Sequence, residues 1–126
     1  MAHLEQRDFL SRVKKLFPEN FFSVKVLDIG SFNVNGTERD FFSNADITGL
    51  DIAEGECVDV VCPAQDYDAP NDSFDTIISC ECWEHNPYYK ESILNALRML
   101  KSGGLFVFTC ATTGREVHGV PELEAE

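Results

Sequence analysis

The sequence predicts an α/β fold in which helices cover a mostly parallel, five-stranded sheet. Five short apolar runs have the length and composition of strands, and segments with helical spacing lie between several of them. The runs are apolar on both faces, which is typical of parallel strands buried between two layers of helices. The expected strands are residues 24–29, 46–51, 58–61, 74–80 and 104–110.

The first expected helix precedes the sheet and covers it. Between residues 3 and 17 the apolar positions recur at helical spacing, and Pro18 ends the pattern. We assign residues 1–20 to this covering helix. Its apolar positions are Leu4, Phe9, Leu10, Val13, Leu16 and Phe17.

Two further helices are expected between the strands, at residues 37–43 and 87–100. The second begins at a proline, which favours a helix start, and carries Ile93, Leu97 and Leu100 on one face. The Lys-Ser-Gly-Gly sequence that follows is expected to stop this helix and to turn the chain into the last strand.

The other connections are too short or too irregular for a crossover helix. Residues 52–57 are few, and residues 62–73 contain two prolines and little periodicity. We expect loops or a single turn in both, and a loop or tail over residues 113–126. With 126 residues, the whole chain is expected to form one domain.

Composition narrows the class of partner and the compartment. Twenty-two acidic residues against ten Lys and Arg give a formal net charge of -12, so we expect neither nucleic acid nor an anionic membrane surface as a partner. Neither a secretion signal nor a membrane-spanning apolar run is recognisable, and a cytoplasmic protein is expected. The five cysteines lack disulfide-framework spacing, which favours reduced thiols.

The stretch VLDIGSFNVNG, residues 26–36, follows the first strand and is a candidate ligand-binding loop. In an open parallel sheet, ligands bind beyond the carboxyl ends of the strands, where the winding direction reverses. Gly30 would let the backbone pass close to a ligand, and free N–H groups at the next helix start would favour an anionic group. The alternative is that Gly30 only forms a tight turn.

Asp51 is a second candidate, at the end of the second strand and 21 residues beyond Gly30. A carboxylate there can accept hydrogen bonds from both ribose hydroxyls of a nucleoside-type cofactor. An aspartate that ends a strand is also a common turn former. Its occurrence together with the glycine turn favours the ribose role.

Four blocks of sequence follow one another in a characteristic order: VLDIG, TGLDI, SFDTIISCECWEH and LKSGGLFVFT. In order and spacing they resemble the class I S-adenosylmethionine-dependent methyltransferase family, in the methyltransferase type 11 style, over residues 22–112. The resemblance implies a Rossmann-like fold, S-adenosylmethionine as cofactor and transfer of a methyl group to an acceptor, which we expect to be a small molecule.

The resemblance also implies a cofactor site. Asp28, Gly30 and Ser31 would face the methionine part of the cofactor, with backbone groups near its carboxylate. Asp51 would hold the ribose, and Ile52 would pack on the adenine. The cofactor-binding residues implied in this way are Asp28, Gly30, Ser31, Asn35, Asp51, Ile52, Gln65 and Cys80.

Three of these residues need a separate reason. Gln65 and Asn35 would compensate for departures from the family pattern, and Cys80 would act through its backbone. Pro63 stands where such enzymes often carry an acid toward the adenine amino group, so that contact would fall to the backbone of Ala64 or to Gln65. Phenylalanine and valine replace two loop glycines, and the side-chain amide of Asn35 would compensate for the lost backbone approach. The backbone carbonyl of Cys80 would approach the methionine ammonium.

Glu84 and His85 are the candidates for a catalytic base, which is needed only if the acceptor must lose a proton. The alternative is that Glu84 is a surface or capping acid and that His85 packs against the following helix. Zinc sites usually take four ligands, and Cys80, Cys82 and His85 lack a second pair at suitable spacing, so no metal site is expected.

Aromatic residues near the fourth strand are candidates for a substrate pocket, although aromatics beside a helix start more often belong to a core. They are Trp83, Tyr88 and Tyr89. His118, in the stretch TTGREVHG, is a weaker candidate by resemblance to the loop after the last strand in some family members.

The family fold normally continues past the fifth strand with a helix and an antiparallel hairpin, which this sequence lacks. We therefore expect either a truncated protein or a homodimer that covers the open sheet edge, since an uncovered edge strand favours association. A non-catalytic module that binds the cofactor or a partner is the alternative to an enzyme. A nicotinamide-binding domain is a second alternative, disfavoured by the absence of G-x-G-x-x-G.

Overall fold

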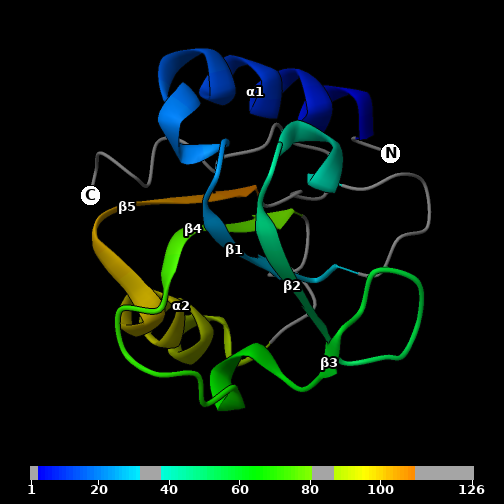
Figure 1. Ribbon diagram of the computed structural model, residues 1–126. Coiled ribbons are helices and arrows are strands. Elements are labelled where there is room, and N and C mark those ends of the chain that lie inside the picture. The colour runs from blue at the N-terminus through cyan, green and yellow to red at the C-terminus, as the bar shows by residue number, and fades with distance from the viewer. Residues whose placement is uncertain (1–2, 32–37, 81–86, 110–126) are drawn as a thin grey trace.

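The fold, seen in a computed structural model that describes residues 3–31, 38–80 and 87–109, is a parallel sheet between helices (Figure 1). Two α-helices are present in this part, α1 (His3–Leu16) and α2 (Tyr89–Met99). The strands are β1 (Lys25–Ile29), β2 (Asp46–Asp51), β3 (Val60–Val61), β4 (Phe74–Cys80) and β5 (Leu100–Thr109). Three short 3-10 turns, η1 (Pro18–Asn20), η2 (Glu38–Phe41) and η3 (Ala64–Asp66), lie between them.

The sheet confirms the predicted five-stranded, parallel, Rossmann-like architecture. Its strand order is β3-β2-β1-β4-β5, and every pair of neighbours is parallel. The chain first winds outward from β1 through β2 to β3 and then crosses back to β4 and β5. The winding therefore reverses between β1 and β4, which is where ligands bind in open sheets of this kind.

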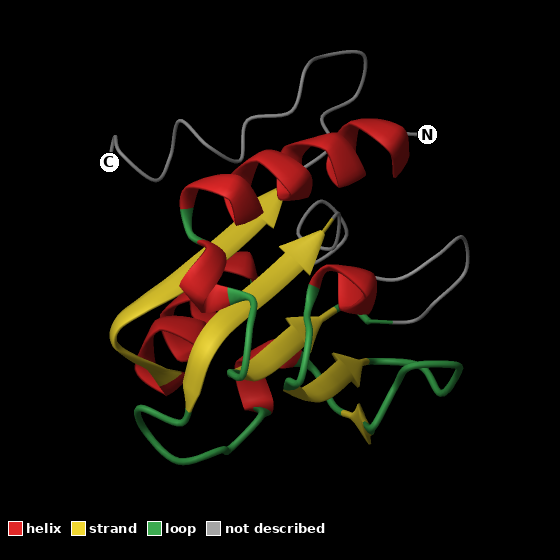
Figure 2. Cartoon of the chain, turned by 45° about the horizontal axis from the view of Figure 1, so that its top comes forward, coloured by secondary structure: helices red, strands yellow, loops and turns green. Residues whose placement is uncertain are grey.

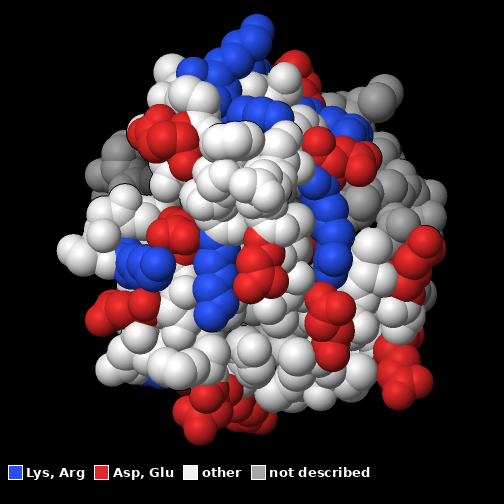
Figure 3. Space-filling view, in the orientation of Figure 1, with Lys and Arg blue, Asp and Glu red and all other residues white. Residues whose placement is uncertain are grey.

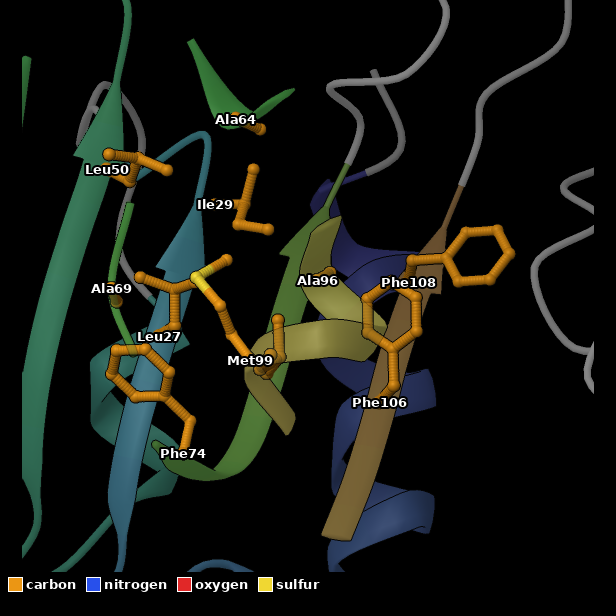
Figure 4. Close-up of a cluster of buried hydrophobic side chains, with 11 residues drawn as sticks. Leu27, Ile29, Leu50, Ala64, Ala69, Phe74, Ala96, Met99, Phe106 and Phe108 are labelled. Carbon is orange, nitrogen blue, oxygen red and sulfur yellow. The ribbon is translucent and has the colours of Figure 1, made fainter. Parts of the chain in front are cut away.

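The two α-helices cover opposite faces of the sheet (Figure 2). On the α1 face, Leu10 packs with the strand residues Val26, Ile78 and Val107. On the α2 face, Ala96 and Met99 join a larger cluster (Figure 4). The strand and connection residues of that cluster are Leu27, Ile29, Leu50, Ala64, Ala69, Phe74, Ile77, Phe106 and Phe108. Burial on both faces explains why the strands are apolar at successive positions.

The end of α2 and the start of β5 differ from the prediction. The Lys-Ser-Gly-Gly sequence does not separate the helix from the strand; β5 begins at Leu100, directly after α2. Leu100 pairs with Phe74 and Leu105 with Thr76, so five steps along β5 match two along β4. The excess forms a bulge around Gly103, whose φ of 81° suits glycine.

The predicted apolar face of α2 was also wrong in part. The helix buries Ser92, Ala96 and Met99, whereas Leu97 is 49% exposed. Small side chains let the helix approach the sheet closely, and leucines lie on its outer side.

Two segments are shorter than predicted. Strand β3 has two residues because Asp59 pairs with Gly49 through both its side chain and its backbone N–H. The helix expected over residues 37–43 is the 3-10 turn η2 instead, followed by Asn44 with a φ of 53°. Residues 62–73, for which loops or a single turn were expected, contain the 3-10 turn η3 and no crossover helix.

Candidate functional site

The candidate site lies at the edge of the sheet where the strands end. Ile29 pairs with Leu50 on one side and with Ser79 on the other, so the next residues along the three strands meet at one edge. Five predicted site residues belong to this edge through the ends of β1, β2 and β4: Gly30, Ser31, Asp51, Ile52 and Cys80. The parallel topology therefore brings these five residues to one edge, and their roles toward a ligand stay predictions.

The turn after β1 is fixed to β2. Gly30 has a φ of 75°, the left-handed region that favours glycine. Its N–H donates to the carbonyl of Leu50 at 2.7 Å, and the N–H of Ser31 donates to the same oxygen at 3.2 Å. Both N–H groups are therefore engaged within the fold. The free N–H groups expected at the start of the following helix are separate from these two and stay a prediction. A ligand carboxylate here would have to be recognised by other groups.

Asp28 and Ser31 are buried beside this turn. Asp28 is 1% exposed and pairs with Gly49 in the β1–β2 ladder. Ser31 is 3% exposed, and among the described residues its Oγ has no hydrogen-bond partner. Contact of Asp28 or Ser31 with a cofactor stays a prediction.

Asp51 and Ile52 combine a fixed carboxylate with an exposed apolar side chain. Asp51 Oδ1 accepts hydrogen bonds from the N–H of Ile52 at 2.7 Å and of Ala53 at 3.3 Å. The turn-forming role considered for Asp51 is therefore real. A carboxylate offers about four acceptor positions, so this turn is compatible with a further bond to a ribose hydroxyl. Ile52 is 74% exposed, as a residue that packs on a flat ring would be.

A polar cluster that the sequence reasoning missed lies next to the turn. Arg39, in η2, donates through Nη2 to Asp59 Oδ2 at 2.8 Å and to the carbonyl of Cys57 at 3.1 Å. The N–H of Gly49 donates to the same Asp59 oxygen at 2.7 Å. This hydrogen bond, together with Arg39, holds the pKa of Asp59 below its usual range. A glycine inside a strand is the signal that points to such a close approach.

Ala64 and Gln65, the residues expected near the adenine, form hydrogen bonds with side chains of α2. The hydroxyl of Ser92 donates to Gln65 Oε1 at 3.3 Å, and Asn95 Nδ2 donates to the carbonyls of Ala64 at 2.8 Å and of Tyr67 at 2.9 Å. These bonds fix η3 beside the helix. A contact of Gln65 with adenine stays a prediction.

The remaining predicted residues are placed only in part. Asn35, Trp83, Glu84, His85 and His118 lie outside the described residues. Tyr88 and Tyr89, just before and at the start of α2, are both exposed, which excludes the core role for them in the described structure.

The described residues also limit other kinds of site. Within residues 3–31, 38–80 and 87–109, no three His, Cys, Asp or Glu side chains come together as metal ligands, and Cys57 and Cys62 are free thiols. No helix in these ranges has the length and apolar character needed to cross a membrane. On the face drawn in Figure 3, basic and acidic side chains are interspersed.

The chain is similar to several solved structures at 20–24% sequence identity. A Galdieria sulphuraria protein described as a candidate sarcosine dimethylglycine methyltransferase has a TM-score of 0.71 at 20% identity, over 86% of this chain and 48% of its own. A second similar structure is Haemonchus contortus phosphoethanolamine N-methyltransferase 2 in complex with phosphomonomethylethanolamine and S-adenosylhomocysteine. It has a TM-score of 0.65 and 24% identity, and the match covers 82% of this chain and 28% of that one. A third, a [4+2]-cyclase, has a TM-score of 0.63 and 22% identity, and the match covers 79% of this chain and 44% of that one.

This chain thus spans less than half of each of these three structures. No curated protein sequence matches it. Residues 27–108, however, match the family of methyltransferase domains. Because this match extends over more than half of the sequence, the chain belongs to the methyltransferase domain family, which uses S-adenosylmethionine as its cofactor.

Proposed function

We propose that this chain binds S-adenosylmethionine at the edge formed by the ends of β1, β2 and β4 and transfers its methyl group to a small-molecule acceptor. One observation carries the proposal. Asp51 ends β2 with a carboxylate fixed by its own turn, next to the exposed Ile52 and level with the Gly30 turn. A carboxylate that can accept hydrogen bonds from the ribose diol, beside an exposed apolar side chain that can pack on the base, suits a nucleoside.

The residues present fit the ribose and the adenine of the cofactor, and they fit its methionine part except for the carboxylate. Asp51 would accept hydrogen bonds from the ribose, and Ile52 would pack on the adenine. For the methionine part, Gly30 lets the backbone approach, and the carbonyl of Cys80 at the end of β4 would accept from the ammonium. The methionine carboxylate would be held by groups other than the N–H groups of Gly30 and Ser31.

The chemistry asked of the protein is mainly positioning. S-adenosylmethionine, when bound, supplies a methyl group on a sulfonium that is already an activated leaving group. The residues of the chain then have to hold the acceptor in line with that methyl and to exclude water. A base such as Glu84 or His85 is required only for an acceptor that must lose a proton.

A small acceptor is supported by the similar Haemonchus contortus enzyme, whose complex contains phosphomonomethylethanolamine. The alternative is a module that binds the cofactor, or a partner, without transferring a methyl group. The similar [4+2]-cyclase favours keeping this alternative, because the same fold there carries a different activity.

Calorimetric titration of the purified chain with S-adenosylmethionine, S-adenosylhomocysteine and NAD tests the proposal. We expect saturable binding of the first two, with NAD at least tenfold weaker, on the order of 1.4 kcal/mol. Tight binding of NAD alone would overturn the cofactor assignment. Binding without methyl transfer, in an assay of release of S-adenosylhomocysteine across a panel of small amines and hydroxyl compounds, would favour the non-catalytic module.

A further inference from the structure

We propose that Asn95, on α2, is a positioning residue for the base of the cofactor, because it holds the η3 turn beside Asp51 and Ile52. This inference rests on the proposed function, since it assigns a role within the same site. Asn95 does not itself contact the cofactor in this account. It bonds the backbone of Ala64 and so holds the turn that carries Gln65, the residue expected at the adenine.

The side-chain amide of Asn95 is fixed by three hydrogen bonds. Its Nδ2 donates to the carbonyl of Ala64 at 2.8 Å and to the carbonyl of Tyr67 at 2.9 Å. Its Oδ1 accepts from Nε of Arg98 at 2.9 Å. A carbonyl only accepts and a guanidinium only donates, so these partners select one orientation of the amide. Because Ala64 begins η3 and Tyr67 follows it, one side chain holds both ends of the turn.

Two further side chains of α2, three residues to either side of Asn95, bond the same connection between β3 and β4. The hydroxyl of Ser92 donates to Gln65 Oε1 at 3.3 Å. Arg98 donates through Nη1 to Asn71 Oδ1 at 2.6 Å. Residues three apart are neighbours on the surface of a helix, so the three side chains form a polar row along α2. Asn95 is at the centre of this row.

The η3 turn lies on the β3 side of Asp51. Asp51 pairs with Val61, and its carbonyl accepts from the N–H of Cys62 at 2.8 Å. Two residues later, Ala64 is buried in the cluster that contains Leu50, the residue before Asp51 (Figure 4). A base carried by a ribose at Asp51 would therefore have η3 as its neighbour on this side.

The α2 side chains engage acceptors of η3 and leave an amide donor for the base. The carbonyl of Ala64 accepts from Asn95, and Gln65 Oε1 accepts from Ser92. The other end of the Gln65 amide, Nε2, carries two N–H groups and is the end that a base can meet. Such a donor matches the bare N1 of adenine. Hypoxanthine carries an N–H at this position, so η3 held in this way should discriminate against it.

Two ligands that differ only in the base test this role. S-adenosylhomocysteine carries adenine, and S-inosylhomocysteine carries hypoxanthine on the same ribose and amino-acid part. In calorimetric titrations of the unaltered chain, we expect the adenine ligand to bind roughly tenfold more tightly. Asn95→Ala releases both carbonyls of η3, so this ratio should fall to less than about threefold through weaker binding of S-adenosylhomocysteine. Asp51→Ala should weaken both ligands and leave the ratio unchanged.

The matched control is Asn44→Ala, at the opposite edge of the sheet. Asn44 Nδ2 donates to Ser23 Oγ at 2.7 Å, and its φ of 53° disfavours alanine, so this variant also loses stability. We expect a lower Tm with an unchanged ratio of the two affinities. An equal fall of the ratio in this control would overturn the inference, because the ratio would then follow stability alone.

Two other results would also overturn the inference: an unchanged ratio in folded Asn95→Ala, or equal binding of the two ligands by the unaltered chain. Failure of the unaltered chain to bind S-adenosylhomocysteine would instead overturn the proposed function.

Ser92→Ala provides the same test should Asn95→Ala fail to fold. It removes a buried hydroxyl with little change in volume and releases Gln65 Oε1, so the amide can turn and present an acceptor to the base. We expect the ratio to fall in the same direction. A ratio equal to that of the unaltered chain would then overturn the assignment of η3 to the base.

Discussion

Substitution of Asp51 separates the two roles that its carboxylate can have. As a turn former, Asp51 needs only an oxygen at the Oδ1 position, where the N–H groups of Ile52 and Ala53 donate. As a ribose ligand, it needs a charged group that accepts from a diol. Asp51→Asn keeps the oxygen and removes the charge, whereas Asp51→Ala removes both.

The expected magnitudes follow from these contacts. Asp51→Ala loses one short hydrogen bond and one long one in an exposed turn, about 1 kcal/mol of the free energy of unfolding. For a chain of this length that lowers Tm by roughly 3–5 °C. Asp51→Asn should stay within about 0.5 kcal/mol of the unaltered chain. For the cofactor, losing charge-assisted bonds to the diol should cost roughly 1.5–3 kcal/mol in both variants.

The assay combines thermal unfolding with calorimetric titration of S-adenosylhomocysteine. Asp46→Asn is the control, since it removes an exposed carboxylate from the other end of the same strand and should change neither Tm nor affinity appreciably. The reasoning is refuted if Asp51→Asn binds with unchanged affinity, because Asp51 would then serve only its turn.

Three further outcomes are expected. Gly49→Ala should lower the free energy of unfolding by about 1–3 kcal/mol, because the added Cβ would overpack the space around it. Gly103→Ala should cost less, since nothing lies within 4 Å of its added Cβ and only the positive φ is strained. Equal denaturant midpoints for the two variants would contradict the crowding at Gly49. The backbone N–H of Lys25, with Lys101, lowers the pKa of Asp75, so stability from Asp75 is present above about pH 4 and lost as the pH falls below it. Urea midpoints should therefore fall on acidification less steeply in Asp75→Asn, and an identical pH profile would exclude this contribution. If the outer edge of β5 mediates a homodimer, light scattering should show a mass that rises with concentration, whereas a constant monomer mass would exclude it.

The positions of β1, β2 and β4 could be read from the sequence because apolar residues on both faces of these strands are buried, which leaves a run of apolar residues. β2 and β4 have the predicted bounds, and β1 differs by one residue. The parallel, Rossmann-like arrangement followed from the alternation of strands with helical segments and from the family resemblance, whereas the order of the strands is seen only in the structure. Parallel topology then brought Gly30 and Asp51 to one edge, as predicted.

The parts that the sequence did not predict depend on side-chain contacts between distant segments. β3 is short because the side chain of Asp59 bonds Gly49, and η2 is a brief turn tied by Arg39. Neither contact has a periodic signature. The engagement of the Gly30 and Ser31 N–H groups with Leu50 likewise depends on the distance between two strands, which spacing along one chain does not give.

The most direct test of the account is where S-adenosylhomocysteine binds. In a ¹⁵N–¹H NMR titration, we expect the backbone amides of Gly30, Ser31, Ile52 and Ala53 to shift on addition of the ligand, because they line the edge at the ends of β1 and β2. The amides of Lys25 and Asp46, at the opposite edge, should not shift. Shifts confined to that opposite edge, or none at saturating ligand, would contradict the proposed site.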